Sequence, residues 1–158
     1  MKIGIIGSGA IGGTLGKLWA QAGHEVLFSS RHPEKLSSLV AQAGSHSRAG
    51  TVAEAAEFGD VILLAVNYGT LDEALRAVNG KLDDKIVIDA TNPLQRAAHG
   101  IERVIPQGVT AGRVMAQHLP SAHIVKAFTT VYAPYLASET YRQGDLLAIG
   151  SASAPWAI

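Results

Sequence analysis

Short apolar runs recur along the chain, separated by stretches in which apolar residues return every three or four positions. The runs are rich in β-branched residues and end at glycine or polar residues, which is typical of strands buried on both faces of a parallel sheet. The intervening spacing is that of amphipathic helices. The runs predict strands at residues 2–6, 25–29, 61–66, 86–89, 124–128 and 146–149.

Glycine and proline mark the ends of the first two predicted helices. Gly23 follows the first helical stretch and occupies the position of a C-terminal glycine. Pro33 suits the first turn of the second helix, and Gly44 follows that helix. Residues 94–119 are less regular and are expected to hold one or two helices.

Two capping-box patterns predict where further helices begin. Thr51-x-x-Glu54 precedes the strand at 61–66, and Thr70-x-x-Glu73 follows it. In such a box the threonine hydroxyl accepts a hydrogen bond from the backbone N–H three residues later, and the glutamate carboxylate accepts one from the threonine N–H. Both patterns therefore predict helix starts beside this strand.

The alternation of strands and helices predicts an α/β protein with a Rossmann-type, doubly wound, mainly parallel sheet covered by helices on both faces. A length of 158 residues suggests a single domain. We assign residues 1–150 to this domain and residues 151–158 to a short apolar tail. The tail carries no charge and contains Trp156, which is consistent with packing in a homodimer interface; the alternative is a short, partly disordered end.

Composition and charge exclude several kinds of function. Lys plus Arg and Asp plus Glu number 13 each, so nothing indicates a nucleic acid or an anionic membrane as a partner. The chain has no cysteine, which excludes disulfides, thiolate nucleophiles and cysteine-ligated metals. The apolar start is too short for a signal peptide or a membrane span, so a cytoplasmic protein is expected.

The sequence GSGAIG directly follows the first strand and fits the pattern G-x-G-x-x-G. Gly7 permits the tight turn, Gly9 lets a pyrophosphate approach the backbone, and Gly12 lets the following helix pack close to the strand. Free N–H groups at the helix start would face the phosphates, with the positive end of the helix dipole behind them. The pattern predicts a dinucleotide site; the alternative is an ordinary strand–helix turn without a ligand.

Two serines and an arginine stand at the end of the second strand, where NAD-selective proteins carry an acid. A carboxylate there binds the ribose 2′-hydroxyl and would repel a 2′-phosphate. The hydroxyl of Ser29 or Ser30 and the guanidinium of Arg31 instead suit a dianionic phosphate, and Lys35 could add a second cation. The sequence therefore predicts NADP(H); the alternative is that Arg31 and Lys35 form a solvated helix entrance.

Four segments together resemble the family of F420-dependent NADP reductases and related small NADP-binding oxidoreductases. They are GIIGSGAIGGTLGKLWAQAGHEVLFSSRHPEKL, DVILLAVNY, IVIDATNPL and VKAFTT. The first half is also similar to the N-terminal domain of pyrroline-5-carboxylate reductase. The resemblance implies hydride transfer between NADPH and the deazaflavin coenzyme F420, or a flavin-like acceptor. It also implies that the usual C-terminal extension of the family is absent here.

The resemblance further implies where the cofactor binds. The 2′-phosphate would lie on Ser30, Arg31 and Lys35, and the pyrophosphate on the backbone of residues 8–11. The ends of the later strands would line the nicotinamide and acceptor side. The expected cofactor-binding residues are Gly7, Ser8, Gly9, Ala10, Ile11, Gly12, Ser29, Ser30, Arg31, Lys35, Val66, Asn67, Tyr68, Ala90, Thr91, Asn92, Pro93 and Thr130.

No set of residues predicts acid–base catalysis or a metal site, and we assign no catalytic residue and no metal. The six histidines are scattered without ligand spacing. Asp89 is interpreted as a turn or cap residue, while Lys126, within a strand, could reach solvent, pair with a carboxylate or bind a phosphate. Transfer between two cofactors needs alignment more than a proton donor, which favours a cofactor reductase. The alternatives are a non-catalytic NADP(H)-binding or redox-sensing module, and a reductase of a small imine or ketone.

Overall fold

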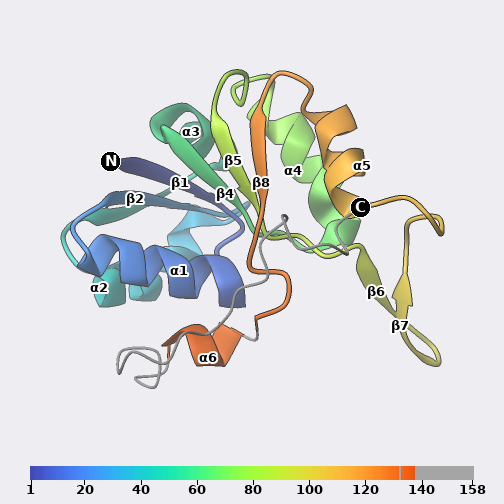
Figure 1. The fold of residues 1–158 in the computed structure, drawn as a ribbon. Helices are drawn as coiled ribbons and strands as arrows, with labels where there is room; N and C mark the ends of the chain where they lie inside the picture. Colours follow the sequence, from blue (N-terminus) through green and yellow to red (C-terminus); the bar gives the residue numbers. More distant parts are fainter. Residues whose placement is uncertain (132, 138–158) are drawn as a thin grey trace.

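Six parallel strands form the central sheet of the protein (Figure 1). The computed structural model describes residues 1–131 and 133–137. The strands lie in the order β3-β2-β1-β4-β5-β8, which confirms the predicted doubly wound Rossmann-type topology. Their bounds are β1 (Lys2–Ile6), β2 (Glu25–Ser29), β3 (Ser47–Gly50), β4 (Val61–Leu64), β5 (Ile86–Asp89) and β8 (His123–Lys126).

Helices cover both faces of the sheet, as the sequence predicts (Figure 1). One face carries α1 (Ala10–Gln21), α2 (Ser37–Ala43) and α6 (Ala133–Ala137). The other carries α3 (Val52–Phe58), α4 (Leu71–Val78) and α5 (Ala111–His118). Short 3₁₀ turns precede two of them: η1 (Pro33–Leu36) before α2, and η2 (Tyr68–Thr70) before α4.

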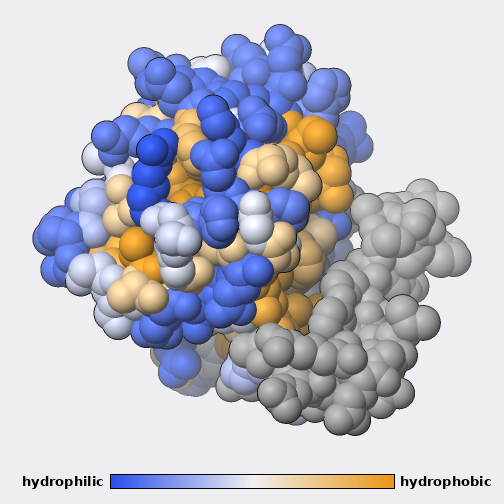
Figure 2. All heavy atoms as spheres, turned by 90° about the vertical axis from the view of Figure 1, so that its left-hand side faces the viewer, coloured by the Kyte–Doolittle hydropathy of each residue, from blue (hydrophilic) through white to orange (hydrophobic). Residues whose placement is uncertain are grey.

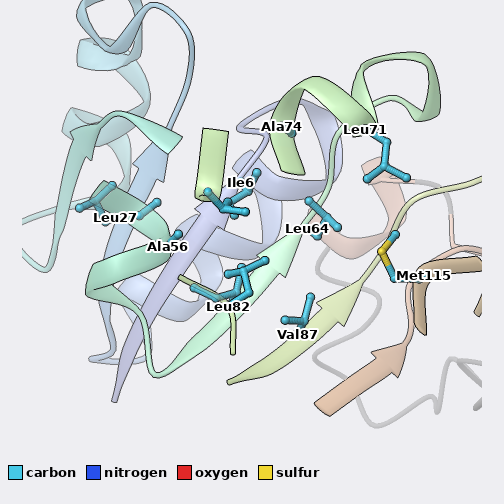
Figure 3. Close-up of a cluster of buried hydrophobic side chains, with 12 residues drawn as sticks. Ile6, Leu27, Ala56, Leu64, Leu71, Ala74, Leu82, Val87 and Met115 are labelled. Atoms are coloured by element: carbon cyan, nitrogen blue, oxygen red, sulfur yellow. The ribbon is translucent and has the colours of Figure 1, made fainter. Parts of the chain in front are cut away.

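The hydrophobic core is divided by the sheet into two clusters. Because successive strand side chains point to opposite faces, neighbouring residues of β1 enter different clusters. Ile5 packs with Phe28 toward α1, whereas Ile6 packs with Leu27 toward α3 and α4. Figure 3 shows the second cluster, in which side chains of the sheet meet Ala56, Ala74 and Met115 from the helices. Continuous apolar runs are thus required because both faces are buried.

Helix α1 packs directly against β2 and the glycine loop because two of its residues are glycines at points of contact. A Cβ on Gly16 would lie 2.2 Å from Cε1 of Phe28, and a Cβ on Gly12 would lie 2.0 Å from the carbonyl oxygen of Gly7. Neither site has room for a methyl group. The close approach fixes the start of α1 directly beside the end of β1.

The stretch 94–119 differs from its prediction. It contains α5, but a β-hairpin of β6 (Leu94–Ala97) and β7 (Gly100–Arg103) precedes this helix and projects away from the sheet (Figure 1). Most of its residues are exposed, including Ile101 at 74%. A ribbon that packs on neither face shows no apolar alternation, which is why no strand was predicted here.

The two capping-box predictions have different outcomes. Thr51 and Glu54 form the complete box at the start of α3, with the Glu54 carboxylate 2.6 Å from the Thr51 nitrogen. Thr70 makes no such cap, because η2 precedes α4 and the Thr70 hydroxyl instead donates to the carbonyl of Asn67 at 3.0 Å. The predicted helix start is confirmed, because Thr70 is the N-cap residue of α4, but the predicted box at Thr70 and Glu73 is absent.

Strand β3 was not predicted, and the expected strand at 146–149 and tail at 151–158 lie outside the described residues. Figure 2 shows the face that carries β2 and α2, which is mainly hydrophilic with smaller apolar areas between the polar ones. Within residues 1–131 and 133–137, no helix is both long and apolar enough to cross a membrane.

Candidate functional site

A cleft of about 580 Å³ opens at the carboxyl ends of the strands, around the glycine loop that joins β1 to α1. In an open α/β sheet this edge is where ligands bind, at the point where the strand order reverses. Most of the residues predicted from the sequence line it: Gly7, Ser8, Gly9, Ala10, Ile11, Ser29, Ser30, Arg31, Val66, Asn67, Tyr68, Ala90 and Asn92.

Each glycine of the loop has a distinct environment. Gly7 has a φ of +97°, a conformation that side chains disfavour, and a Cβ there would lie 2.7 Å from the Ala65 carbonyl. Gly12 packs against Gly7, as described above, and does not line the cleft. Gly9 lines the cleft, and a Cβ there would meet no protein atom within 4 Å. The loop therefore leaves open space above Gly9.

The amino end of α1 adds electrostatic attraction to this space. Gly9 is the N-cap residue; no side chain accepts a hydrogen bond from the first N–H groups, and the first turn contains no acidic residue. Uncapped N–H groups and the positive end of the helix dipole favour an anion. The loop is therefore suited to a phosphate group.

At the end of β2, the two predicted serines differ in their availability. Ser29 is fully buried, and its hydroxyl donates to the carbonyl of Ile5 at 2.7 Å. The backbone carbonyl of Ser29 in turn accepts a hydrogen bond from the hydroxyl of Ser8 at 3.0 Å. Ser30 is partly exposed at the cleft, and its Oγ accepts a hydrogen bond from the N–H of His32 at 3.1 Å. Of the two hydroxyls, that of Ser30 is the one presented to the cleft.

Arg31 lies at the mouth of the cleft and faces an acid on the opposite side. Its Nη1 is 3.4 Å from Oε2 of Glu73, with the side chains 69% and 53% exposed respectively. Both residues line the cleft. Lys35, predicted to add a second cation, is exposed in η1 and is not among the lining residues.

The end of β4 contributes Val66, Asn67 and Tyr68. Burial raises the pKa of the Tyr68 hydroxyl above its usual value, and the negative charges of Asp89 and Asp72 raise it further. The hydroxyl therefore stays protonated at neutral pH. A neutral hydroxyl at the cleft can both donate and accept hydrogen bonds.

The end of β5 is joined to the end of β8 by polar contacts, most of them around the buried Asp89. Asp89 Oδ1 accepts hydrogen bonds from the N–H and the hydroxyl of Thr91, at 2.8 and 2.7 Å. Asp89 Oδ2 accepts one from Lys126 Nζ at 2.9 Å, and Lys126 also donates to the Thr91 carbonyl. Asn92 Nδ2 donates to the carbonyl of Thr129 at 2.9 Å. Of the three alternatives for Lys126, the structure has the pair with a carboxylate.

Three residues predicted at the ends of the later strands do not reach the cleft. Thr91 is 1% exposed and hydrogen-bonded to Asp89, while Pro93 is partly exposed and Thr130 is exposed. None of the three lines the cleft. Ala90 and Asn92 are the residues of this loop that do.

Further lining residues were not predicted from the sequence. Several come from α4 and the turn before it, at positions 70, 73, 74 and 77. This spacing places them on one side of the helix, at the margin of its buried face. The sequence pattern shows which helix face is apolar but not that its margin borders a cleft. The additional residues are Leu36, Val52, Ala65, Thr70, Glu73, Ala74, Ala77 and Leu94.

Across residues 1–131 and 133–137, no group of three or more histidine, aspartate or glutamate side chains is placed to hold a metal ion.

The sheet order, the glycine loop and the cleft define a Rossmann-type dinucleotide-binding domain. A family model for "NADP oxidoreductase coenzyme F420-dependent" matches residues 2–93, more than half of the chain. The chain therefore belongs to this family of NADP-dependent oxidoreductases. This confirms the resemblance drawn from the sequence.

Individual relatives agree with the family. The chain is 33% identical over 108 residues to the F420-dependent NADP reductase of Methanothermobacter thermautotrophicus, covering 63% of this chain and 47% of the relative. It thus spans about half the length of that curated relative. A protein from Arthrobacter sp. FB24, provisionally assigned as an F420-dependent NADP reductase, is 26% identical with a TM-score of 0.75, over 88% of this chain and 67% of that one.

A more distant structure shares the fold alone. Plasmodium falciparum pyrroline carboxylate reductase with NADP bound is 17% identical with a TM-score of 0.59, over 86% of this chain and 44% of that one. The similarity expected with pyrroline-5-carboxylate reductase is therefore present at the level of the fold.

Proposed function

We propose that the cleft binds NADP(H) and that the protein transfers a hydride between NADPH and a deazaflavin such as coenzyme F420, or a flavin-like acceptor. One observation carries the proposal: a single cleft combines an uncapped helix start behind Gly9 with a guanidinium, Arg31, at its mouth. Pyrophosphate and 2′-phosphate are the two anionic parts of NADP(H), and each has a suitable partner in the cleft.

The residues present fit this cofactor. The space above Gly9 would admit the pyrophosphate, and the N–H groups at the start of α1 would bind it. Arg31 and Ser30 would hold the 2′-phosphate, with Lys35 contributing a more distant positive charge. Because β2 and β5 lie on opposite sides of β1 and β4, the nicotinamide end would lie toward Ala90 and Asn92.

The protein's part in the reaction would be to align the nicotinamide with the acceptor. Bound NADPH would supply the hydride, and the acceptor would take a proton from solvent to complete its two-electron reduction. The buried Asp89–Lys126 pair would hold the Ala90–Asn92 loop in place. This reaction needs no proton-transfer residue of the protein.

A second candidate is reduction of a small imine or ketone, which Tyr68 favours. Such a reduction must deliver a proton to nitrogen or oxygen along with the hydride. Tyr68 lines the cleft, and its hydroxyl, whose pKa is raised further above neutrality mainly by burial, carries a proton that it could donate. Loss of imine reduction in Tyr68→Phe, with NADPH binding unchanged, would support this candidate.

The test is NADPH oxidation with F420, with FMN as a parallel acceptor and NADH as the control donor. Fast turnover with NADPH and F420 but little with NADH is the expected result. Tight NADPH binding without turnover on F420, FMN or a small imine would instead identify a binding module.

Arg31→Ala tests the cofactor assignment separately from the acceptor. The variant should weaken NADPH binding while leaving NADH binding nearly unchanged, because only NADPH carries the 2′-phosphate. A net loss of one charge-assisted contact corresponds to about 1.5–3 kcal/mol, or roughly tenfold or more in Kd. Equal weakening for both cofactors would contradict the assignment.

A further inference from the structure

Glu73 occupies a position that the proposed cofactor does not explain. It lies in the first turn of α4, lines the cleft, and its carboxylate pairs with Arg31 across the cleft mouth at 3.4 Å. The 2′-phosphate assigned to Arg31 would therefore have to approach a guanidinium that already has an anionic partner.

The topology explains how these two residues meet. Arg31 follows β2, and α4 follows β4, and these strands flank β1 on either side. The two side chains thus reach toward each other over the end of β1, where the glycine loop begins. Their pair spans the cleft instead of lying along one wall.

The negative charge of Glu73 would affect the binding of NADPH and NADH differently. A phosphate dianion bound to Arg31 would displace the Glu73 carboxylate from the guanidinium but would remain close to that carboxylate. The two negatively charged groups would then repel each other. An unphosphorylated ribose carries no charge at this position and would leave the Arg31–Glu73 pair in place. The acid therefore weakens binding of the phosphorylated cofactor more than that of the unphosphorylated one.

From this geometry we infer that Glu73 is a specificity-determining residue that competes with the 2′-phosphate for Arg31 and so limits the preference for NADPH over NADH. The inference rests on the proposed binding of NADP(H) in this cleft. Because both side chains are more than half exposed, the effect is modest and is screened by salt.

Asp72 provides a matched control for Glu73. It is the adjacent acid in the same first turn of α4, so both acids interact similarly with the helix dipole, but Asp72 is not among the residues that line the cleft. Glu73→Gln and Asp72→Asn remove one negative charge each while keeping nearly the same shape.

The experiment measures Kd for NADPH and NADH by cofactor fluorescence, at low and high salt, for the wild-type chain and both variants. Glu73→Gln should tighten NADPH binding by about twofold to fivefold at low salt and leave NADH binding unchanged. Asp72→Asn should change neither value by a comparable amount. The gain should shrink at high salt, which a purely structural effect would not do.

A double-mutant cycle tests whether Glu73 acts through Arg31. In the Arg31→Ala background, Glu73→Gln should give a smaller gain in NADPH affinity than in the wild type. Failure of the wild-type chain to bind NADPH would overturn the proposed function. Normal NADPH binding with no gain in Glu73→Gln, or weaker NADH binding in that variant, would overturn only the role of Glu73.

Discussion

The ammonium group of Lys126 lies 2.9 Å from Oδ2 of Asp89, a carboxylate with no exposed surface. The other oxygen of Asp89 accepts two hydrogen bonds from Thr91. One buried acid therefore connects β8 to the loop that leaves β5, at the edge of the sheet that borders the cleft.

Removing the cation should be costly, because the Asp89 charge would remain buried without a partner. Lys126→Met is expected to lower the free energy of unfolding by about 3 kcal/mol, measured by urea denaturation. Asp89→Asn combined with Lys126→Met should lower the free energy of unfolding less than Lys126→Met alone, since the buried charge is then removed as well. A double variant no more stable than the single one would contradict this account.

Gly9 should be needed for the ligand and not for the fold. Its φ of −80° is accessible to alanine, and a methyl group there would meet no protein atom. Gly9→Ala is therefore expected to keep the wild-type stability but to weaken NADPH binding by about tenfold, or about 1.4 kcal/mol, because the methyl group would occupy the space assigned to the pyrophosphate.

Gly12→Ala provides the contrast for this variant. Its methyl group would clash with the Gly7 carbonyl, so the free energy of unfolding itself should fall. Titration with NADPH and thermal unfolding of both variants separate the two effects. Unchanged NADPH affinity in Gly9→Ala would place the pyrophosphate elsewhere.

Tyr68 should make the protein less stable at alkaline pH. Its pKa is raised in the folded state, mainly by burial, so its contribution to stability is fully present below the ordinary tyrosine pKa of 10.0. Above that pH the unfolded chain ionises first, and stability is lost until the folded-state pKa is passed. Urea unfolding between pH 9 and 11 should therefore show a smaller decline for Tyr68→Phe than for the wild type. Identical declines would show that Tyr68 does not contribute.

The contact between Gly16 and Phe28 should not tolerate an added methyl group. The Phe28 ring is fully buried and cannot move aside, so Gly16→Ala is expected to destabilise the protein by about 2 kcal/mol. Gly112→Ala is the matched control, because a Cβ at this helical position meets nothing within 4 Å. That variant should be unchanged or more stable by up to about 1 kcal/mol, as alanine favours the helix.

The predictable part of the fold is the part whose strands are buried on both faces. β1, β2 and β5 have the predicted bounds because continuous apolar runs are imposed by helices above and below them. β3 (Ser47–Gly50) lies at the sheet edge and has only one buried residue, Gly50, so it carries no such run. Hydrogen bonding to β2 makes it a strand, and this information is not local.

The candidate site also has one part that the local sequence predicts and another that depends on the fold. The glycine loop and Arg31 follow from a local pattern, because the turn and the helix start are made by consecutive residues. Glu73 was interpreted as a cap because its partner, Arg31, is distant in the sequence and comes near only through the strand order. The pairing of Lys126 with Asp89 likewise depends on β8 lying beside β5.

The close contact between Gly16 and Phe28 also limits which substitutions these two positions can accept. A larger residue at position 16 requires a smaller residue at position 28, so substitutions at the two positions should be correlated among related sequences. A pair of compensating substitutions at positions 16 and 28 would shift α1 relative to the sheet. Because α1 begins at the glycine loop, the loop would move as well. Drift in cofactor affinity could thus originate from two core positions that never touch the cofactor.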